Sequence, residues 1–140
     1  MEWIKYSIDY GIIGFLILLS VVSFAVSIER WLMMRSVKVS EYADKRELEI
    51  KVTMRLHLIA SIGSNAPYIG LLGTVLGIML TFHAMGVQGY MDSSRIMTGL
   101  ALALKATAVG LLVAIPSVAF YNLLLRRAKV LLLQWDINHG

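Results

Sequence analysis

The sequence has no cysteine and only three histidines among its 140 residues. Without cysteine, disulfides and thiolate metal sites are excluded. The histidines, His57, His83 and His139, are scattered without the spacing of metal ligands. The sequence also lacks a Ser-His-Asp set, a glycine-rich phosphate loop and paired carboxylates. We therefore do not expect an enzyme, and the sequence predicts no catalytic residue, no metal and no cofactor.

Charged side chains are nearly absent from three long stretches. Residues 10–28 and 66–85 have none, and residues 96–125 have only Lys105. A helix of about 20 apolar residues crosses the core of a bilayer. We therefore predict an all-α membrane protein with three transmembrane helices, at about residues 10–28, 65–85 and 96–125. The third stretch exceeds one membrane thickness, so we expect long second and third helices that extend into the cytoplasm.

The first apolar stretch has a second interpretation as a cleaved signal peptide, because Ala25-Val26-Ser27 resembles a cleavage site. The stretch is long for a signal peptide, and the acidic residues Glu2 and Asp9 precede it. We therefore favour a retained helix. Three serines near one face of this helix predict a packing stripe: Ser20, Ser23 and Ser27.

Positive charge is concentrated in two segments. Residues 30–64 contain seven basic residues and residues 126–140 contain three. The segment before the first span and the loop between the second and third spans have one each, Lys5 and Arg95. Basic residues stay on the cytoplasmic side of a membrane, so residues 29–64 and 126–140 should be cytoplasmic and the N-terminus should face outward. The net charge of +4 would also suit a nucleic acid. Because the basic residues flank apolar spans, we interpret them as topology signals beside membrane lipids, with no nucleic-acid partner.

The segment after the first span alternates apolar and polar residues from Leu48, which is typical of a strand. Leu48, Val52, Leu56 and Ile59 also fit one face of a helix. A single strand would have nothing to pair with, so we predict a helix that runs on into the second span. Residues 86–94 should form a turn, and residues 126–140 an amphipathic helix at the membrane surface.

Small residues line one face of each long span. At about 100° per residue, Gly70, Gly73, Thr74 and Gly77 share a face of the second span. The third span has a similar face, and Pro116 within it predicts a kink. The members of this second face are Ala103, Ala106, Thr107, Gly110, Ala114 and Ser117.

These faces have two interpretations, and both remain open on physical grounds. In the first, they are close helix-packing surfaces, and the hydroxyls of Thr74 and Thr107 bond to carbonyls one turn back. In the second, the threonines line a proton pathway. Three helices cannot enclose a pore, so a channel would need several copies of the chain.

Lys105 is the one charged residue inside an expected span. An ionisable group at this depth suggests a function, although its side chain can also extend toward the membrane surface. It lies about 160° around the helix from Thr107, so the two residues cannot share a narrow face. Because the expected spans contain no Asp or Glu, we expect Lys105 to meet a carboxylate from a neighbouring copy or another protein. Any proton-carrying carboxylate must likewise come from a partner.

Two segments resemble the ExbB/TolQ/MotA proton-channel family, and its ExbB branch most closely. They are SIGSNAPYIGLLGTVLGIM at residues 61–79 and GLALALKATAVGLLVAIPSVAFYN at residues 99–122. The resemblance implies one membrane domain over residues 1–140 of a short family member in a bacterial inner membrane, with a periplasmic N-terminus and a cytoplasmic C-terminus.

The resemblance further implies a ring-shaped homo-oligomer, generally a pentamer, around a pore that holds the transmembrane helices of an ExbD-like partner. The partner brings the proton-carrying aspartate, and Thr74 and Thr107 match the pore-facing threonines of the family. Proton-motive force would then drive a TonB-like protein for uptake across the outer membrane. The chain departs from the family at Leu102, where a glutamate is usual, and at Lys105, where an apolar residue is usual. We therefore expect Lys105 to replace that glutamate by pairing with a carboxylate.

Three other functions remain open. A TolQ-like subunit would serve envelope maintenance and cell division instead of uptake. A non-conducting scaffold would only anchor a partner protein in the membrane. A small secondary transporter would need a substrate site and, typically, inverted repeats, and the sequence contains no such repeat.

Overall fold

The computed structural model describes residues 2–89 and 92–140, and over these residues the regular structure is entirely helical. The elements are α1 (Glu2–Ser36), the short 3-10 helix η1 (Val39–Glu41), α2 (Lys45–Thr53), α3 (Leu56–Gln88) and α4 (Ser93–His139). The expected all-α class is therefore confirmed. The strand considered for the segment from Leu48 is wrong, since that segment is helical.

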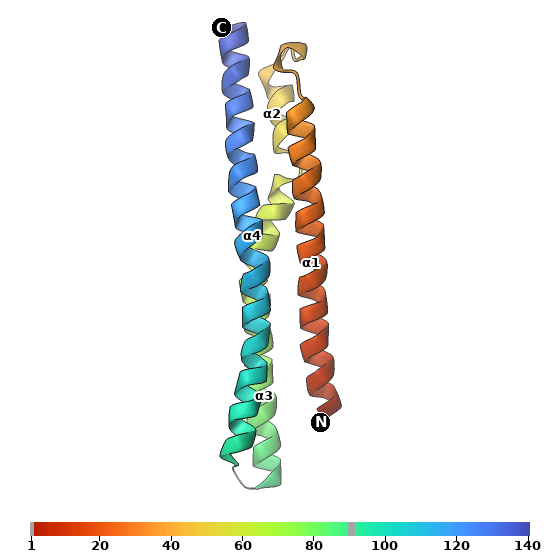
Figure 1. Ribbon diagram of the computed structural model, residues 1–140, viewed down its shortest axis with the longest axis vertical. Coiled ribbons are helices and arrows are strands. Elements are labelled where there is room, and N and C mark those ends of the chain that lie inside the picture. The colour runs from red at the N-terminus through yellow and green to blue at the C-terminus, as the bar shows by residue number, and fades with distance from the viewer. Residues whose placement is uncertain (1, 90–91) are drawn as a thin grey trace.

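The long helices run side by side in an elongated bundle (Figure 1). The first turns of α1, the end of α3 and the start of α4 lie at one end, called here the N-terminal end of the bundle. The end of α1, η1, α2 and the C-terminus lie at the other, the C-terminal end (Figure 1). The chain therefore reverses its direction from α1 to α3 and again from α3 to α4, as three successive membrane spans require.

Within the described residues, three helical segments are long and apolar enough to cross a membrane: Trp3–Ser36, Lys45–Gln88 and Ser93–His139. At about 1.5 Å per residue, α4 is roughly 70 Å long, whereas a bilayer core is about 30 Å thick. About half of α4 must therefore extend beyond any bilayer that the helix crosses. The bulky residues of α3 remain exposed on the surface of the chain, as membrane-facing or subunit-facing residues would be: Leu71, Leu72, Val75 and Met79.

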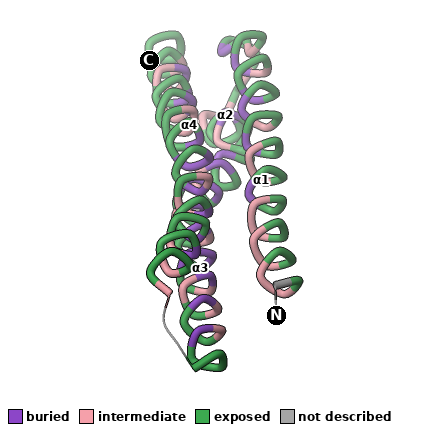
Figure 2. Tube along the Cα trace, turned by 60° about the horizontal axis from the view of Figure 1, so that its bottom comes forward, coloured by how far each residue is buried: buried purple, intermediate pink, exposed green. Residues whose placement is uncertain are grey.

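Helices α3 and α4 pack along their small-residue faces, and the buried residues follow this contact (Figure 2). A Cβ atom added to Gly70 would lie 2.6 Å from the carbonyl oxygen of Ala106, and one added to Gly110 would lie 2.6 Å from that of Ala66. Each glycine thus lies directly against the backbone of the opposite helix. Such close approach lets two membrane helices gain dispersion contacts without a hydrophobic driving force.

The expected continuous helix through residues 48–59 is interrupted between α2 and α3. Arg55 adopts the left-handed conformation, with φ of 66°, and it is the one non-glycine residue with positive φ among those described. Leu48, Val52, Leu56 and Ile59 are nevertheless all buried in one cluster, as their spacing predicts. The cluster also contains Met34 of α1 and, from α4, Leu124, Ala128 and Leu131.

Arg30 of α1 stabilises this interruption. Its guanidinium donates hydrogen bonds to the carbonyl oxygens of Lys51 (3.1 Å) and Met54 (3.5 Å), which the broken helix leaves without intrahelical partners. Arg30 is only 4% exposed. Its charge is compensated by Glu29, whose carboxylate accepts two hydrogen bonds of 2.6 Å from it and lies 3.4 Å from Arg55.

Residues 126–139 continue α4 without a break, as a helical continuation of the third span. Their apolar side packs within the chain, where Leu131 is buried and Trp135 Nε1 donates to the carbonyl oxygen of Tyr42 (2.9 Å). Lys45 and Asp136 form an ion pair of 2.8 Å beside them. Helix α2 and the residues around η1 therefore cover this apolar side, and a position at a membrane surface stays a prediction.

The turn between the second and third spans begins later than residue 86. Helix α3 continues to Gln88 and is capped by Gly89, with φ of 76°. Helix α4 then begins after Asp92, whose carboxylate accepts a hydrogen bond from Ser94 N (3.0 Å). Asp44 caps α2 in the same way, and its hydrogen bonds to Arg46 lower the pKa of its carboxyl.

Replacing Gly70 by alanine should destabilise the protein, because the new Cβ atom would force α3 and α4 apart. We expect a loss of about 1–3 kcal/mol, measured as a lower thermal midpoint of the detergent-solubilised protein. Gly86→Ala is the matched control on α3, since its Cβ would meet nothing within 4 Å. That change should leave stability equal or higher by up to about 1 kcal/mol. Equal midpoints for the two variants would contradict the close contact.

Replacing Arg30 by glutamine should also destabilise the protein, because the carbonyl oxygens of Lys51 and Met54 lose their hydrogen-bond donor. We expect a loss of about 1–3 kcal/mol in the free energy of unfolding, followed by circular dichroism. Arg46→Gln removes a cation whose side chain is 87% exposed, and it should change stability by less than about 0.5 kcal/mol. Equal losses of unfolding free energy in the two variants would show that Arg30 does not stabilise the interruption between α2 and α3.

Candidate functional site

Two threonine hydroxyls meet across the packed faces of α3 and α4. The Oγ1 atoms of Thr74 and Thr107 are hydrogen-bonded to each other. Thr74 Oγ1 also donates to the carbonyl oxygen of Ala103 (2.9 Å), on the opposite helix. The two threonines therefore form a polar pair, called here the threonine pair, within an otherwise apolar contact.

The two members of the pair differ in access. Thr74 is 6% exposed, whereas Thr107 is partly exposed at the edge of the contact. The carbonyl oxygen of Gly70 lies 3.4 Å from Thr74 Oγ1 and 3.5 Å from Thr107 Oγ1, and it offers a further acceptor. When Thr74 donates to Ala103, it can still accept from Thr107, which leaves lone pairs of Thr107 free for another donor. The pair can therefore present one hydroxyl to water or to a partner while the other remains held by the protein.

The glycines surround the threonine pair and bring the two helices close enough for it to form. A Cβ atom added to Gly70 would lie 3.2 Å from the Cα atoms of both Gly110 and Thr107. Gly73 and Gly77 lie one turn apart, where added Cβ atoms would come within 2.7 Å of Ala106 Cβ and 2.9 Å of Ala103 Cβ. A larger residue at any of these positions would separate the backbones and pull the two hydroxyls apart.

A second hydroxyl contact joins α1 to α4. Ser23 Oγ and Ser117 Oγ lie 2.7 Å apart, and both serines are almost fully buried. Ser27 donates to the carbonyl oxygen of Ser23 (2.7 Å) on its own helix. The serine spacing in α1 indicated the packing stripe, but no local signal identified Ser117 as the residue it contacts. Ser117 directly follows Pro116, and α4 continues as a helix through both residues.

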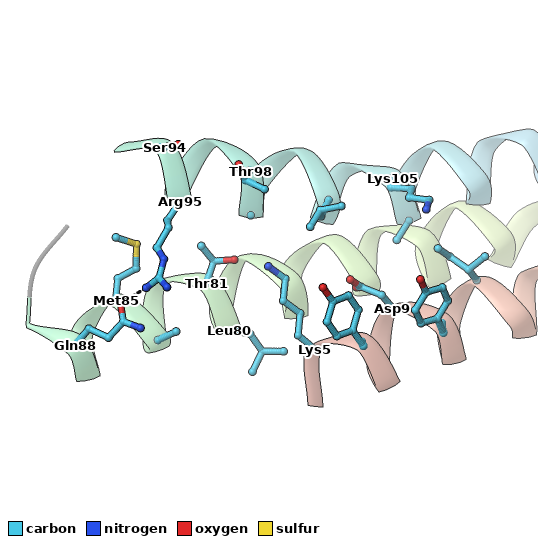
Figure 3. A pocket seen from close by; sticks show the side chains of 17 residues that line it. Lys5, Asp9, Leu80, Thr81, Met85, Gln88, Ser94, Arg95, Thr98 and Lys105 are labelled. Carbon is cyan, nitrogen blue, oxygen red and sulfur yellow. Dashed lines mark hydrogen bonds between the residues drawn. The ribbon is translucent and has the colours of Figure 1, made fainter. Parts of the chain in front are cut away.

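Lys105 lies away from the threonine pair, in a cavity at the N-terminal end of the bundle (Figure 3). The cavity has a volume of about 410 Å³ and is bordered by α1, α3 and α4. Its lining includes Lys5 and Asp9 of α1, so a carboxylate of the same chain shares the cavity with Lys105. Asp9 directly precedes the expected first span, so the hydropathy pattern does not identify it as an acid near Lys105. The structure separates Lys105 and Thr107 into two sites.

The described residues contain no group of three or more histidine, cysteine, aspartate or glutamate side chains that could hold a metal ion. Hydroxyls and backbone carbonyls provide the polar atoms at the threonine pair, whereas the cavity has ammonium, guanidinium, carboxylate, amide and hydroxyl groups. Such groups can order water and bind ions or a partner's polar side chain.

Three long apolar helices that pack along small-residue faces define a helical membrane protein. Residues 25–137 match the model of the MotA/TolQ/ExbB proton channel family. The chain is 56% identical to the biopolymer transport protein ExbB of Aquifex aeolicus, over all of this chain and 95% of that protein. It is 57% identical to the ExbB-like 2 protein of Helicobacter pylori, over 96% of this chain and 90% of that protein.

A more distant similarity reaches the TolQ branch. The Tol-Pal system protein TolQ of Pseudomonas aeruginosa is 40% identical over 60% of this chain and 36% of that protein. The chain therefore belongs to the MotA/TolQ/ExbB proton channel family. This is a family of channel and transport proteins, and the ExbB resemblance inferred from the sequence is confirmed.

The two hydroxyls of the threonine pair should stabilise the protein jointly. In a cycle of Thr74→Val, Thr107→Val and the double variant, we expect a coupling free energy of about 0.5–1.5 kcal/mol, measured from unfolding. Thr53→Val on α2 is the control, because its hydroxyl bonds to Glu49 of its own helix, and it should combine additively with Thr107→Val. Additivity of the two pair variants would contradict a contact between their hydroxyls.

Proposed function

We propose that this chain is the proton-channel and stator subunit of an inner-membrane complex of the ExbB–ExbD–TonB type. In this proposal it uses proton-motive force to power uptake across the outer membrane. The observation that carries the proposal is the threonine pair, because it places hydroxyls at the edge of an apolar helix contact in a family of proton channels.

The proposal requires several copies of the chain, most simply a ring of five. Three packed helices leave no continuous passage, and α3 and α4 use their small faces against each other. Their outer faces carry large exposed apolar residues that suit contacts between copies, including Leu71 and Met79 of α3 and Leu112 of α4. In a ring, the partly exposed side of Thr107 would face the central space.

The proposal also requires a partner, described here as ExbD-like. A proton crossing a membrane needs a titratable carrier, yet residues 10–28, 66–85 and 96–125 contain no Asp or Glu. A transmembrane helix of the partner would bring its aspartate to the threonine pair. Thr107 can accept a hydrogen bond from the protonated carboxyl while it donates to Thr74, and it can donate to the charged carboxylate when Thr74 turns its own proton from Ala103 to Thr107. A TonB-like protein would then take up the mechanical work.

Orientation follows the positive residues. The N-terminus would be periplasmic, and the C-terminal end of the bundle, with Arg30, Arg126 and Arg127, would be cytoplasmic. A TolQ-like role in envelope maintenance is the second candidate, supported by the 40% identity to a TolQ protein. A chain that only anchors a partner is the third, and proton-flux measurements separate it from the other two.

Co-expression with an ExbD-like partner should give a closed assembly in detergent. We expect the mass of the chain's own ring to be about five times 15.6 kDa, with added mass when the partner is present. In vesicles containing the complex, Thr107→Val should reduce proton flux about tenfold or more while the mass of the assembly stays unchanged, because general acid–base contacts are typically worth at least that much. Thr107→Ser, which keeps the hydroxyl, should retain most of the flux.

A monomer or dimer that ignores the partner would contradict the channel proposal. Unchanged flux in an intact Thr107→Val assembly would favour the scaffold. Depletion of the chain in cells distinguishes the other two functions, because loss of uptake supports the ExbB-type role and defective constriction supports the TolQ-like role.

A further inference from the structure

The first half of α3 exposes a row of polar side chains on the surface of the chain. The members of this row, called here the polar face of α3, are His57, Ser61, Ser64, Asn65 and Tyr68. At about 100° per residue, four of them fall within about 60° of one another, and Asn65 lies at the margin. The polar face is distinct from the small-residue face of the same helix, which packs against α4.

At the level of the polar face, the surface of α4 is apolar. A Cβ atom added to Gly63 would lie 2.9 Å from Cγ2 of Val118, so this part of α3 is level with Val118. Val118 is itself exposed, as are Ile115 one turn before it and Leu123 just beyond it. At one and the same level, α4 therefore exposes apolar side chains and α3 exposes polar ones.

The surface of α1 is apolar at this level as well. Ser23 of α1 marks the level, because its Oγ lies 2.7 Å from that of Ser117, the residue before Val118. The neighbouring Phe24 is 55% exposed. The apolar run of α1 continues to Ile28, about 8 Å further along the helix. The apolar surfaces of α1 and α4 thus extend past the level of the polar face, so this level still lies within the depth of the bilayer.

The polar face has hydrogen-bonding atoms that its own helix does not satisfy. Ser64 Oγ and Asn65 Nδ2 both donate to the carbonyl oxygen of Ser61, at 3.2 Å and 2.8 Å. These bonds use donor hydrogens and leave the lone pairs of Ser64 Oγ and Asn65 Oδ1 as acceptors on the exposed side. Such groups are costly in hydrocarbon, where nothing donates to them. Water suits them, and lipid does not.

The polar face opens on the same side of the chain as Thr107. On α3, a Cβ atom added to Gly73 would lie 3.2 Å from Ile12 of α1, and Gly73 is about 150° around the helix from the centre of the polar face. On α4, Val113 clusters with Leu16 of α1 and is about 120° around the helix from Thr107. The polar face and Thr107 therefore both face away from α1, along one side of the contact between α3 and α4.

We propose that the polar face of α3 borders a water-filled passage from the threonine pair to the cytoplasm, through which protons leave the channel. This inference rests on the channel function proposed above and assigns the exit side of the same pathway. Tyr68 lies six residues, about 9 Å along α3, from Thr74, and His57 lies about 16 Å further on. Hydroxyl, amide and imidazole groups donate and accept hydrogen bonds, so they can hold a chain of water molecules over this length. The proton moves through that water, and the polar face keeps the water in place.

Cysteine labelling tests the passage, because the chain has no cysteine of its own. Ser61→Cys and Ser64→Cys are introduced one at a time into the complex with an ExbD-like partner, in inside-out membrane vesicles. The probe is a positively charged methanethiosulfonate, which does not cross membranes. Because the thiolate is the reacting form, both thiols should react at least about tenfold faster than a thiol in lipid. Ile115→Cys is the matched control, exposed on α4 at nearly the same level.

Proton flux, compared before and after labelling of the same variant, is the second readout. The reagent leaves a fixed positive charge on the sulfur, and this charge should repel protons in the passage and reduce flux about fivefold or more. The same treatment of Ile115→Cys should leave flux unchanged.

Equal labelling rates at positions 64 and 115 would overturn the proposal, because the polar face would then be covered by lipid or by another protein. Fast labelling of Ser61→Cys and Ser64→Cys with no change in flux would overturn the exit role. A complex that labels as expected but conducts no protons before labelling would contradict the channel function itself, and the exit role with it, because the labelling rates depend on water alone.

Discussion

The backbone contact between α3 and α4 at Gly70 and Gly110 is the constraint on which the rest of the structure depends. Each glycine lies where a Cβ atom would come within 2.6 Å of a carbonyl oxygen on the opposite helix. Only at this separation can Thr74 reach both Thr107 and the carbonyl oxygen of Ala103. Because lipid is as apolar as the side chains, dispersion and hydroxyl bonds must hold membrane helices together. The small residues therefore allow the backbones of α3 and α4 to approach closely, and the threonines form hydrogen bonds across that short separation.

The other end of the molecule is stabilised by different physics. There the residues of α2 and the last turns of α4 bury large side chains in a cluster that includes Leu48, Leu124 and Leu131, as in a water-soluble bundle. The interruption at Arg55 lies between these two differently stabilised parts of the molecule. Where the helix is interrupted, the carbonyl oxygens of Lys51 and Met54 lack intrahelical donors, and Arg30 donates hydrogen bonds to both. Glu29 compensates the charge of Arg30. A buried arginine so close to an apolar span is tolerable because each of its partners is within hydrogen-bond distance.

Periodicity and hydropathy predicted the features that depend on neighbouring residues along one helix. The three long helices, the buried face of Leu48 and Val52, and the family resemblance all follow from patterns of this kind. The interruption at Arg55 could not be predicted, because the apolar pattern runs through it unbroken and the group that stabilises it lies on α1. The cavity shared by Lys105 and Asp9 was missed for a similar reason. It joins residues almost a hundred positions apart, and Asp9 lies one residue outside the expected span. The roles of the threonines and of Pro116 remain predictions.

The distribution of charge explains why such a chain would act with partners. Its apolar stretches contain hydroxyls, one lysine (Lys105) and one histidine (His83), but no carboxylate. The chain can therefore orient water, yet those stretches have no carboxylate that could carry a proton by changing its charge state. The hydroxyls and the cations also occupy different places, the first at the contact of α3 and α4 and the second in the cavity beside α1. An acid entering from another protein would thus meet neutral hydroxyls, where it can lose and regain a proton without being trapped in an ion pair. Lys105 lies in that cavity, on the opposite side of α4 from Thr107, where it would not compete for such an acid.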